Sequence, residues 1–257
     1  MASLIRVGGR DFATIVKALG ERRHYQALVG MASIYANPLR ELRNYLFRGG
    51  SYPRALKLRT PLGPQSVLLD TPDDLLTVNE VFCRLDYEAL SDIRVVVDFG
   101  SNIGLSALYF LTRNPYVRVF LHEPVPRNNQ RLTENLQNFI GRYRLAETCV
   151  GTSDGEVEFG VEPTGRYGGI GIETGEKKRF PVRDVNALLA EVFAQPEIAR
   201  IDILKTDIEG YDVPVLQSIR REFLDRIDCI YAELPFSFPL PGFTCTQRGM
   251  IVCWTRT

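Results

Sequence analysis

The sequence predicts an α/β fold in which a doubly wound, mostly parallel sheet ends in an antiparallel hairpin. An apolar run at 95–97 stops at Asp98, and a turn with two glycines and an apolar helical pattern follow it. From this point short apolar runs alternate with helical patterns, as they do where helices cover both faces of a parallel sheet. Acidic residues follow several of the predicted strands, at the edge where such sheets bind ligands.

Composition narrows the possible partners and environment of the chain. The 257 residues are 45% hydrophobic, and 31 Lys and Arg balance 31 Asp and Glu. This formal net charge of zero argues against a nucleic-acid partner, which requires a basic excess or a basic face. Five scattered cysteines and two histidines predict neither a disulfide framework nor a zinc site, and reduced thiols fit a cytoplasmic protein. We expect no transmembrane segment and no signal peptide, because no apolar run has the required length.

The first ninety residues (1–90) are predicted to form a lid or scaffold of helices and one hairpin. Turn residues at 61–64 separate two segments with strand patterns, and helical spacing recurs on either side of them. The patterned segments are 12–19 and 37–48 for helices, 56–70 for the hairpin and 71–82 for a further helix. Arginines and lysines decorate the helices, which favours a solvated face and leaves peripheral contact with a membrane as the alternative.

Residues 91–257 are predicted to form the second domain, which carries the site. The predicted strands are 95–97, 117–121, 145–150, 156–159, 201–206 and 229–232. The predicted helices are 105–112, 126–140, 185–192 and 213–219. Segments 243–247 and 250–254 flank Arg248-Gly249, which predicts a closing hairpin.

Five acids collect at the carboxyl ends of the predicted strands, and such a group is more typical of a ligand site than of solvated loops. They are Asp98, Glu123, Asp207, Glu209 and Glu233. Glu123 lies 19 residues after Gly104, at the end of the second strand. An acid at this place accepts hydrogen bonds from a ribose diol, so the spacing indicates an adenosine-type cofactor.

The glycine turn discriminates between adenosine cofactors. Dinucleotide-binding turns have three glycines around a pyrophosphate, whereas this turn has only Gly100 and Gly104 and begins with Asp98. A carboxylate repels a pyrophosphate and suits a cationic ammonium group, directly or through water. A ligand with an adenosine end and an amino-acid end is S-adenosylmethionine, so we expect this cofactor. A nicotinamide-dependent oxidoreductase is the disfavoured alternative.

Four segments carry a further indication: Asp98-Phe-Gly-Ser-Asn-Ile-Gly104, His122-Glu-Pro-Val-Pro126, Gly151-Thr-Ser-Asp-Gly155 and Leu204-Lys-Thr-Asp-Ile-Glu-Gly-Tyr211. Together they resemble the FkbM family of S-adenosylmethionine-dependent methyltransferases, and the resemblance covers about residues 78–234. It implies a seven-stranded, Rossmann-like class I methyltransferase sheet and O-methylation of a sugar, glycolipid or polyketide-type natural product. The segment 234–242 is shorter than is usual in the family. The shape of the acceptor pocket and the order of the final strands could therefore differ from those of the family.

The resemblance also implies a role for most site residues. The cofactor-binding residues are Asp98, Gly100, Ser101, Asn102 and Gly104 for the methionine end, Glu123 for the ribose, and Thr152 and Ser153 near the adenine. Asp207 and Glu209 face the methyl-transfer site as the first and second candidates for the base. Apart from the resemblance, two residues are candidates for acceptor binding: Tyr167, in a glycine-rich loop in the right part of the chain to cover an acceptor, and Glu233, an acid at the end of a predicted strand.

Several alternatives stay open at this point. Glu209 could order the following turn, Glu233 could order a neighbouring loop, and the loop around Tyr167 could be an ordinary connection. The acids could hold Mg²⁺, although no accompanying ligand pattern supports a metal. Lys205, inside a strand, is expected to pair with an acid, and His122 is expected to point into packing. A non-catalytic module that only binds S-adenosylmethionine is the remaining alternative function.

Overall fold

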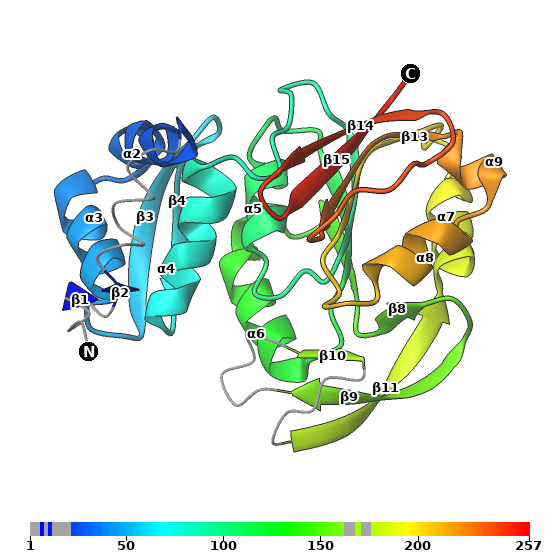
Figure 1. Ribbon diagram of the computed structural model, residues 1–257, viewed down its shortest axis with the longest axis horizontal. Helices are drawn as coiled ribbons and strands as arrows, with labels where there is room; N and C mark the ends of the chain where they lie inside the picture. Colours follow the sequence, from blue (N-terminus) through cyan, green and yellow to red (C-terminus); the bar gives the residue numbers. More distant parts are fainter. Residues whose placement is uncertain (1–5, 8–9, 12–21, 162–167, 171–175) are drawn as a thin grey trace, which may run out of the picture. The chain divides into compact units, whose positions relative to one another are not determined.

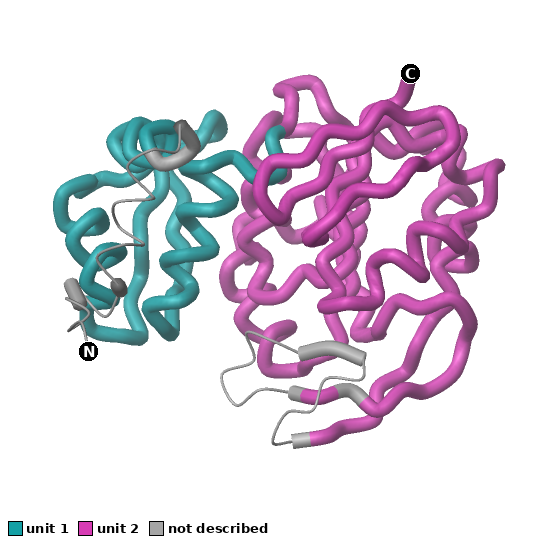
Figure 2. Tube along the Cα trace, viewed as in Figure 1, with its two compact units in different colours: residues 1–88 teal, residues 89–257 magenta. Residues whose placement is uncertain are grey.

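We describe the chain from a computed structural model, which describes residues 6–7, 10–11, 22–161, 168–170 and 176–257. The chain divides into two compact units, Met1–Glu88 and Ala89–Thr257 (Figure 2). Each unit has its own strands and its own buried residues, so each is described separately. The helix predicted at 12–19 lies outside the described residues.

The N-terminal unit contains the predicted hairpin and the helices predicted at 37–48 and 71–82 (Figure 1). Its elements are β1 (Arg6–Val7), β2 (Arg10–Asp11), α2 (Arg22–Ile34), α3 (Pro38–Phe47), β3 (Arg54–Thr60), β4 (Gly63–Leu69), α4 (Pro72–Val78) and the π-helical turn η1 (Asn79–Cys83). Thr71 caps α4 in a reciprocal arrangement, because its hydroxyl accepts from the Asp74 backbone while the Asp74 carboxylate accepts from the Thr71 backbone. Alternate side chains of the β3–β4 hairpin are buried, so one of its faces forms the core of this unit.

The second unit contains a sheet with seven described strands in the order β14-β15-β13-β12-β5-β6-β7. These strands are β5 (Val95–Phe99), β6 (Arg118–His122), β7 (Tyr143–Ala146), β12 (Ile201–Thr206), β13 (Ile227–Glu233), β14 (Phe243–Arg248) and β15 (Ile251–Arg256). The pairs among β7, β6, β5, β12 and β13 are parallel, whereas β15 runs antiparallel to both β13 and β14. The predicted fold class and the closing hairpin are therefore confirmed.

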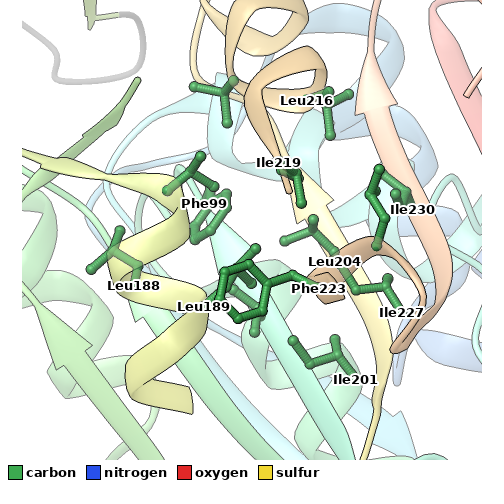
Figure 3. Close-up of a cluster of buried hydrophobic side chains, with 14 of the residues drawn as sticks. Phe99, Leu188, Leu189, Ile201, Leu204, Leu216, Ile219, Phe223, Ile227 and Ile230 are labelled. Carbon is green, nitrogen blue, oxygen red and sulfur yellow. The ribbon is translucent and has the colours of Figure 1, made fainter. Parts of the chain in front are cut away.

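Helices cover both faces of this sheet, with α5 and α6 on one face and α7 and α8 on the other (Figure 1). Their bounds are α5 (Leu105–Leu111), α6 (Pro126–Asn135) with the 3-10 turn η2 (Gln137–Phe139), α7 (Val185–Phe193), α8 (Asp212–Ser218) and α9 (Arg221–Leu224). All five residues of β5 are buried, which is expected for a central strand with helices on both sides. Figure 3 shows the resulting core, a cluster of buried side chains that includes Leu188 and Leu189 of α7, Phe99 of β5 and Leu204 of β12.

The structure differs from the prediction at 145–150, where one strand was expected. Two strands are present instead, because β7 ends at Ala146 and β8 (Cys149–Gly151) joins a second sheet. This sheet has the order β10-β9-β11-β8, with β9 (Gly155–Val161), β10 (Gly168–Ile170) and β11 (Glu176–Asp184). Strand β11 was not predicted from the sequence. Its residues 177–179 are charged and exposed, so this strand lacks the apolar alternation from which strands are predicted.

Candidate active site

The glycine turn after β5 has a backbone conformation that requires glycine at position 100. Gly100 has φ +77°, and a Cβ there would lie 1.9 Å from the carbonyl oxygen of Asp207. Asn102 also has a positive φ of 47°, and Gly104, at φ +82°, is the N-cap of α5. The turn is therefore packed directly against the segment that follows β12, which brings two of the predicted site segments together.

Asp98 lies beneath this turn and is completely buried. It is opposite Lys205 in the register of the parallel strands β5 and β12. Its Oδ1 accepts a hydrogen bond from Lys205 Nζ at 2.9 Å, and its Oδ2 accepts one from Ser106 Oγ at 2.5 Å. The predicted pairing of Lys205 with an acid is confirmed. The cation that pairs with Asp98 is therefore Lys205 of the protein itself, whereas the sequence analysis expected the ammonium group of the cofactor.

Lys205 connects three parts of the site from its buried position. Besides the bond to Asp98, its Nζ donates to the Gly100 carbonyl at 3.0 Å and lies 3.8 Å from Oδ2 of Asp207. Burial alone would lower the pKa of Lys205, but the carboxylates of Asp98 and Asp207 raise it above its ordinary value. The side chain is consequently a cation that links the glycine turn to the candidate base.

Glu123 follows β6 and joins the glycine turn from the other side. Its Oε2 accepts from the Asn102 backbone at 2.9 Å, and its Oε1 accepts from the Val125 backbone at 3.0 Å and from Asn128 Nδ2 at 3.2 Å. Burial raises the pKa of this carboxyl, whereas these three donors lower it, with a net rise. The Glu123 carboxylate is therefore held in one orientation beside the glycine turn.

The segment after β12 is shaped by a residue that the sequence analysis missed. Glu209, at φ +51°, and Gly210, at φ +88°, both have left-handed backbone conformations. The buried carboxylate of Asp212 accepts from Thr206 Oγ1 at 2.7 Å and from the Ile208 backbone at 3.2 Å, so it closes this loop. The only available signal was a third acid at the start of the following helix. Asp207 itself keeps 29% of its side chain exposed.

Thr152 and Ser153 are exposed and line an open hollow. The other lining residues are Gly151, Asp154, Gly155, Glu156, Val157, Val182 and Tyr211. The hydroxyl oxygens of Tyr211 and Thr152 are 3.5 Å apart, so the hollow connects the turn at 151–155 with the loop that contains Asp207. Tyr211 was quoted in the sequence motif but was not predicted to line a site.

The remaining predicted residues are placed as follows. Ser101 is buried, and its hydroxyl donates to the Asp98 carbonyl at 2.9 Å. Glu233 is exposed at the end of β13, one residue beyond Ala232, which pairs with Thr206. His122 is buried and packs edge-on against Phe99, as predicted. Tyr167 lies outside the described residues.

Within the described ranges, no group of three or more His, Cys, Asp or Glu residues could hold a metal ion. No helix in the described part of the chain is long and apolar enough to cross a membrane.

Comparison with known proteins identifies the family. A family model described as "Methyltransferase FkbM domain" matches residues 98–247. The hexuronic acid methyltransferase AglP of Haloferax volcanii is 26% identical over 223 residues, which cover 86% of this chain and 83% of AglP. The 2-O-methyltransferase NoeI of Sinorhizobium fredii is 35% identical over 65 residues, which cover 25% of this chain and 26% of NoeI.

Among solved structures, methyltransferase FkbM from Methylobacillus flagellatus aligns with a TM-score of 0.47 and 16% identity, over 95% of this chain and 60% of that chain. The family model spans more than half of the sequence and contains the glycine turn, Glu123 and the loop after β12. This chain is therefore a methyltransferase that belongs to the FkbM family.

Proposed function

We propose that this protein is an S-adenosylmethionine-dependent O-methyltransferase that acts on a hydroxyl of a sugar, glycolipid or polyketide-type natural product. One observation carries the proposal: Lys205 brings the glycine turn and Asp207 to a single place at the carboxyl ends of β5 and β12. Two relatives with sugar-type or 2-O specificity in their names support the choice of acceptor. Five free cysteines are compatible with our proposal of a cytoplasmic location.

The donor groups at the site fit this cofactor. The fixed carboxylate of Glu123 suits a ribose diol, and the hollow beside Thr152 and Ser153 suits the adenine. The backbone of the turn from Gly100 to Gly104 suits the methionine end, and Ser101 of this turn donates a hydrogen bond to the Asp98 carbonyl. We assign no metal to the reaction. The N-terminal region keeps the proposed role of a lid or scaffold.

The chemistry required of the protein is mainly alignment. S-adenosylmethionine supplies an activated sulfonium methyl group when it is bound. The protein must hold the acceptor hydroxyl in line with that methyl group and remove its proton as the new C–O bond forms. We assign Asp207 to accept this proton, since its carboxylate is partly exposed and its backbone is held by a 3.0 Å bond to the Phe99 carbonyl. Glu209 is the second candidate, and Glu233 is assigned to the acceptor.

Calorimetry and turnover measurements test the two halves of the proposal. We expect S-adenosylmethionine to bind with a Kd of micromolar order. Binding should be lost in Glu123→Ala and in Asp98→Ala. Asp207→Asn should still bind the cofactor while transfer to a glycoside falls about 10²-fold or more. Asp228→Asn, at the start of β13 and paired with Arg200 at the surface, is the matched control, and it should bind the cofactor and transfer the methyl group as wild type does. Absence of cofactor binding to the folded wild-type protein would overturn the proposal.

A further inference from the structure

Helix α3 has an unusual distribution of side chains. Its one fully buried residue is Glu41, whereas Leu39 is 84% exposed and Phe47 is 55% exposed. An ordinary surface helix places its apolar side chains toward the core and its charges toward solvent. Neighbouring helix α2 also exposes large apolar side chains. We call Tyr25, Leu28, Val29, Leu39, Leu46 and Phe47 the α2–α3 apolar set, and its members are 43% to 84% exposed.

Specific contacts of Glu41 fix this orientation of α3. Arg54 of strand β3 donates two hydrogen bonds to the Glu41 carboxylate, one of them at 3.1 Å. Arg40 Nε donates to it at 2.9 Å and Asn44 Nδ2 at 3.3 Å. Breaking a buried ion pair by rotating one partner to solvent costs about 3–5 kcal/mol. The helix therefore cannot turn its leucines inward without leaving Arg54 unpaired, and the outward apolar side chains are a stable feature.

The charge of this segment is strongly one-sided. Residues 22–60 contain eight Lys or Arg and one acid, Glu41, so their net charge is +7 in a chain whose total is zero. Because that acid is buried, the segment has no exposed carboxylate of its own, while Arg40 pairs with Glu41 and Arg48 pairs with Asp73 of helix α4. Arg40 and Arg48 keep 61% and 52% of their side chains exposed, and Arg43 is exposed as well.

We propose that α2 and α3 bind the surface of a membrane that contains anionic lipids. Apolar side chains would enter the boundary between head groups and acyl chains, and the arginines would contact lipid phosphates. Exposed aliphatic residues such as Leu39 and Val29 favour a bilayer over a nucleic acid, whose binding relies on basic and aromatic side chains. This binding does not depend on the proposed reaction, because it uses no residue of the candidate active site.

Vesicle flotation of the full chain tests the proposal. We expect the protein to float with vesicles of phosphatidylcholine and phosphatidylglycerol, to remain unbound with phosphatidylcholine alone, and to dissociate as salt is raised. The double variant Leu39→Asp/Phe47→Asp should bind the vesicles at least about tenfold more weakly than wild type. The matched control is Leu90→Asp/Ile140→Asp, which places the same two charges on side chains that are 73% and 78% exposed in the other unit. It should bind as wild type.

A second variant guards against a folding defect. Arg43→Glu reverses one exposed charge without changing an apolar residue, and it should weaken flotation severalfold while thermal unfolding stays unchanged. The proposal is overturned if wild type does not float with anionic vesicles, if it floats equally with neutral ones, or if the control variant loses binding as fully as the α2–α3 variant. Binding to RNA in place of vesicles would equally contradict it.

Discussion

At the scale of single residues, Lys205 determines how the site is assembled. It has both a buried carboxylate and a backbone carbonyl of the glycine turn within hydrogen-bond distance. Sequence alone predicted its pairing with an acid but not which acid, because the partner Asp98 lies 107 positions earlier and meets it only through strand register. Asp212 was missed for a different reason: Thr206 and Ile208 are only six and four positions away, but they meet its carboxylate through the left-handed backbone of Glu209 and Gly210, which the sequence pattern did not reveal.

Removal of the Lys205 charge should therefore damage the unit that carries the site. Lys205→Met leaves Asp98 buried without its cation, so the free energy of unfolding should fall by about 3–5 kcal/mol. Urea unfolding measures this loss. Adding Asp98→Asn to the same chain should recover part of it, because the uncompensated charge is then absent. Equal and additive losses from the two substitutions would show that the pair is not coupled.

His122 should make the stability of the protein depend on pH. Burial, together with the charge of Arg183, lowers the pKa of this imidazole to about 4. In the unfolded chain its pKa is about 6.5, so between these two values the unfolded chain binds a proton that the native protein does not. Stability contributed by neutral His122 is thus complete above about pH 6.5 and is lost as pH falls toward 4, by at most about 3 kcal/mol.

Unfolding measured between pH 4 and pH 7 in wild type and in His122→Gln checks this expectation. The variant is expected to be less stable at every pH, since it alters a buried side chain packed against Phe99. The informative quantity is the difference between the two curves, which should shrink on acidification. A constant difference would mean that His122 does not titrate in this range.

At the scale of elements, the glycine turn packs against the segment after β12 so closely that no side chain fits at Gly100. Gly100→Ala would place a methyl group 1.9 Å from a backbone oxygen, so one of the two segments must move. We expect loss of cofactor binding and a fall in unfolding free energy well above 1 kcal/mol, the usual scale of a strained backbone. Gly141→Ala is the matched control, because Gly141 also has a positive φ, of +87°, but has nothing within 4 Å.

The control separates backbone strain from steric conflict. Gly141→Ala should cost about 1 kcal/mol and leave cofactor binding intact, since only its φ is unfavourable. Calorimetry with S-adenosylmethionine and urea unfolding together provide both values. Comparable effects of the two substitutions would contradict the importance of the Gly100 contact.

Elements differ in how far the sequence predicts them, for identifiable reasons. Strand β12 was predicted to the residue, because Ile201, Ile203 and Leu204 fall in one short segment that ends at the turn residues 207–210. The divided strand at 145–150 was not, because two short strands in different sheets share one apolar pattern. The inverted orientation of α3 was also missed. Its partner Arg54 lies 13 residues beyond Glu41, outside the helical period from which a buried face is judged.

At the scale of the whole molecule, cofactor binding should stabilise one unit selectively. The proposed ligand contacts all belong to the unit formed by residues 89–257, which has its own core. A ligand present at 100 times its Kd adds about 2.7 kcal/mol to the unfolding free energy of the unit that binds it. S-adenosylhomocysteine is a suitable probe, because it should occupy the same site without transferring a methyl group.

The chain provides a specific reporter for this effect. Its single tryptophan, Trp254, is fully buried in β15, packs against Phe238 and donates from its ring nitrogen to the Phe238 carbonyl at 2.8 Å. Its fluorescence therefore follows unfolding of the second unit alone. Urea unfolding monitored by Trp254 should shift to higher concentration with S-adenosylhomocysteine in wild type but not in Glu123→Ala. An equal shift in that variant would place the ligand at a site that does not involve Glu123.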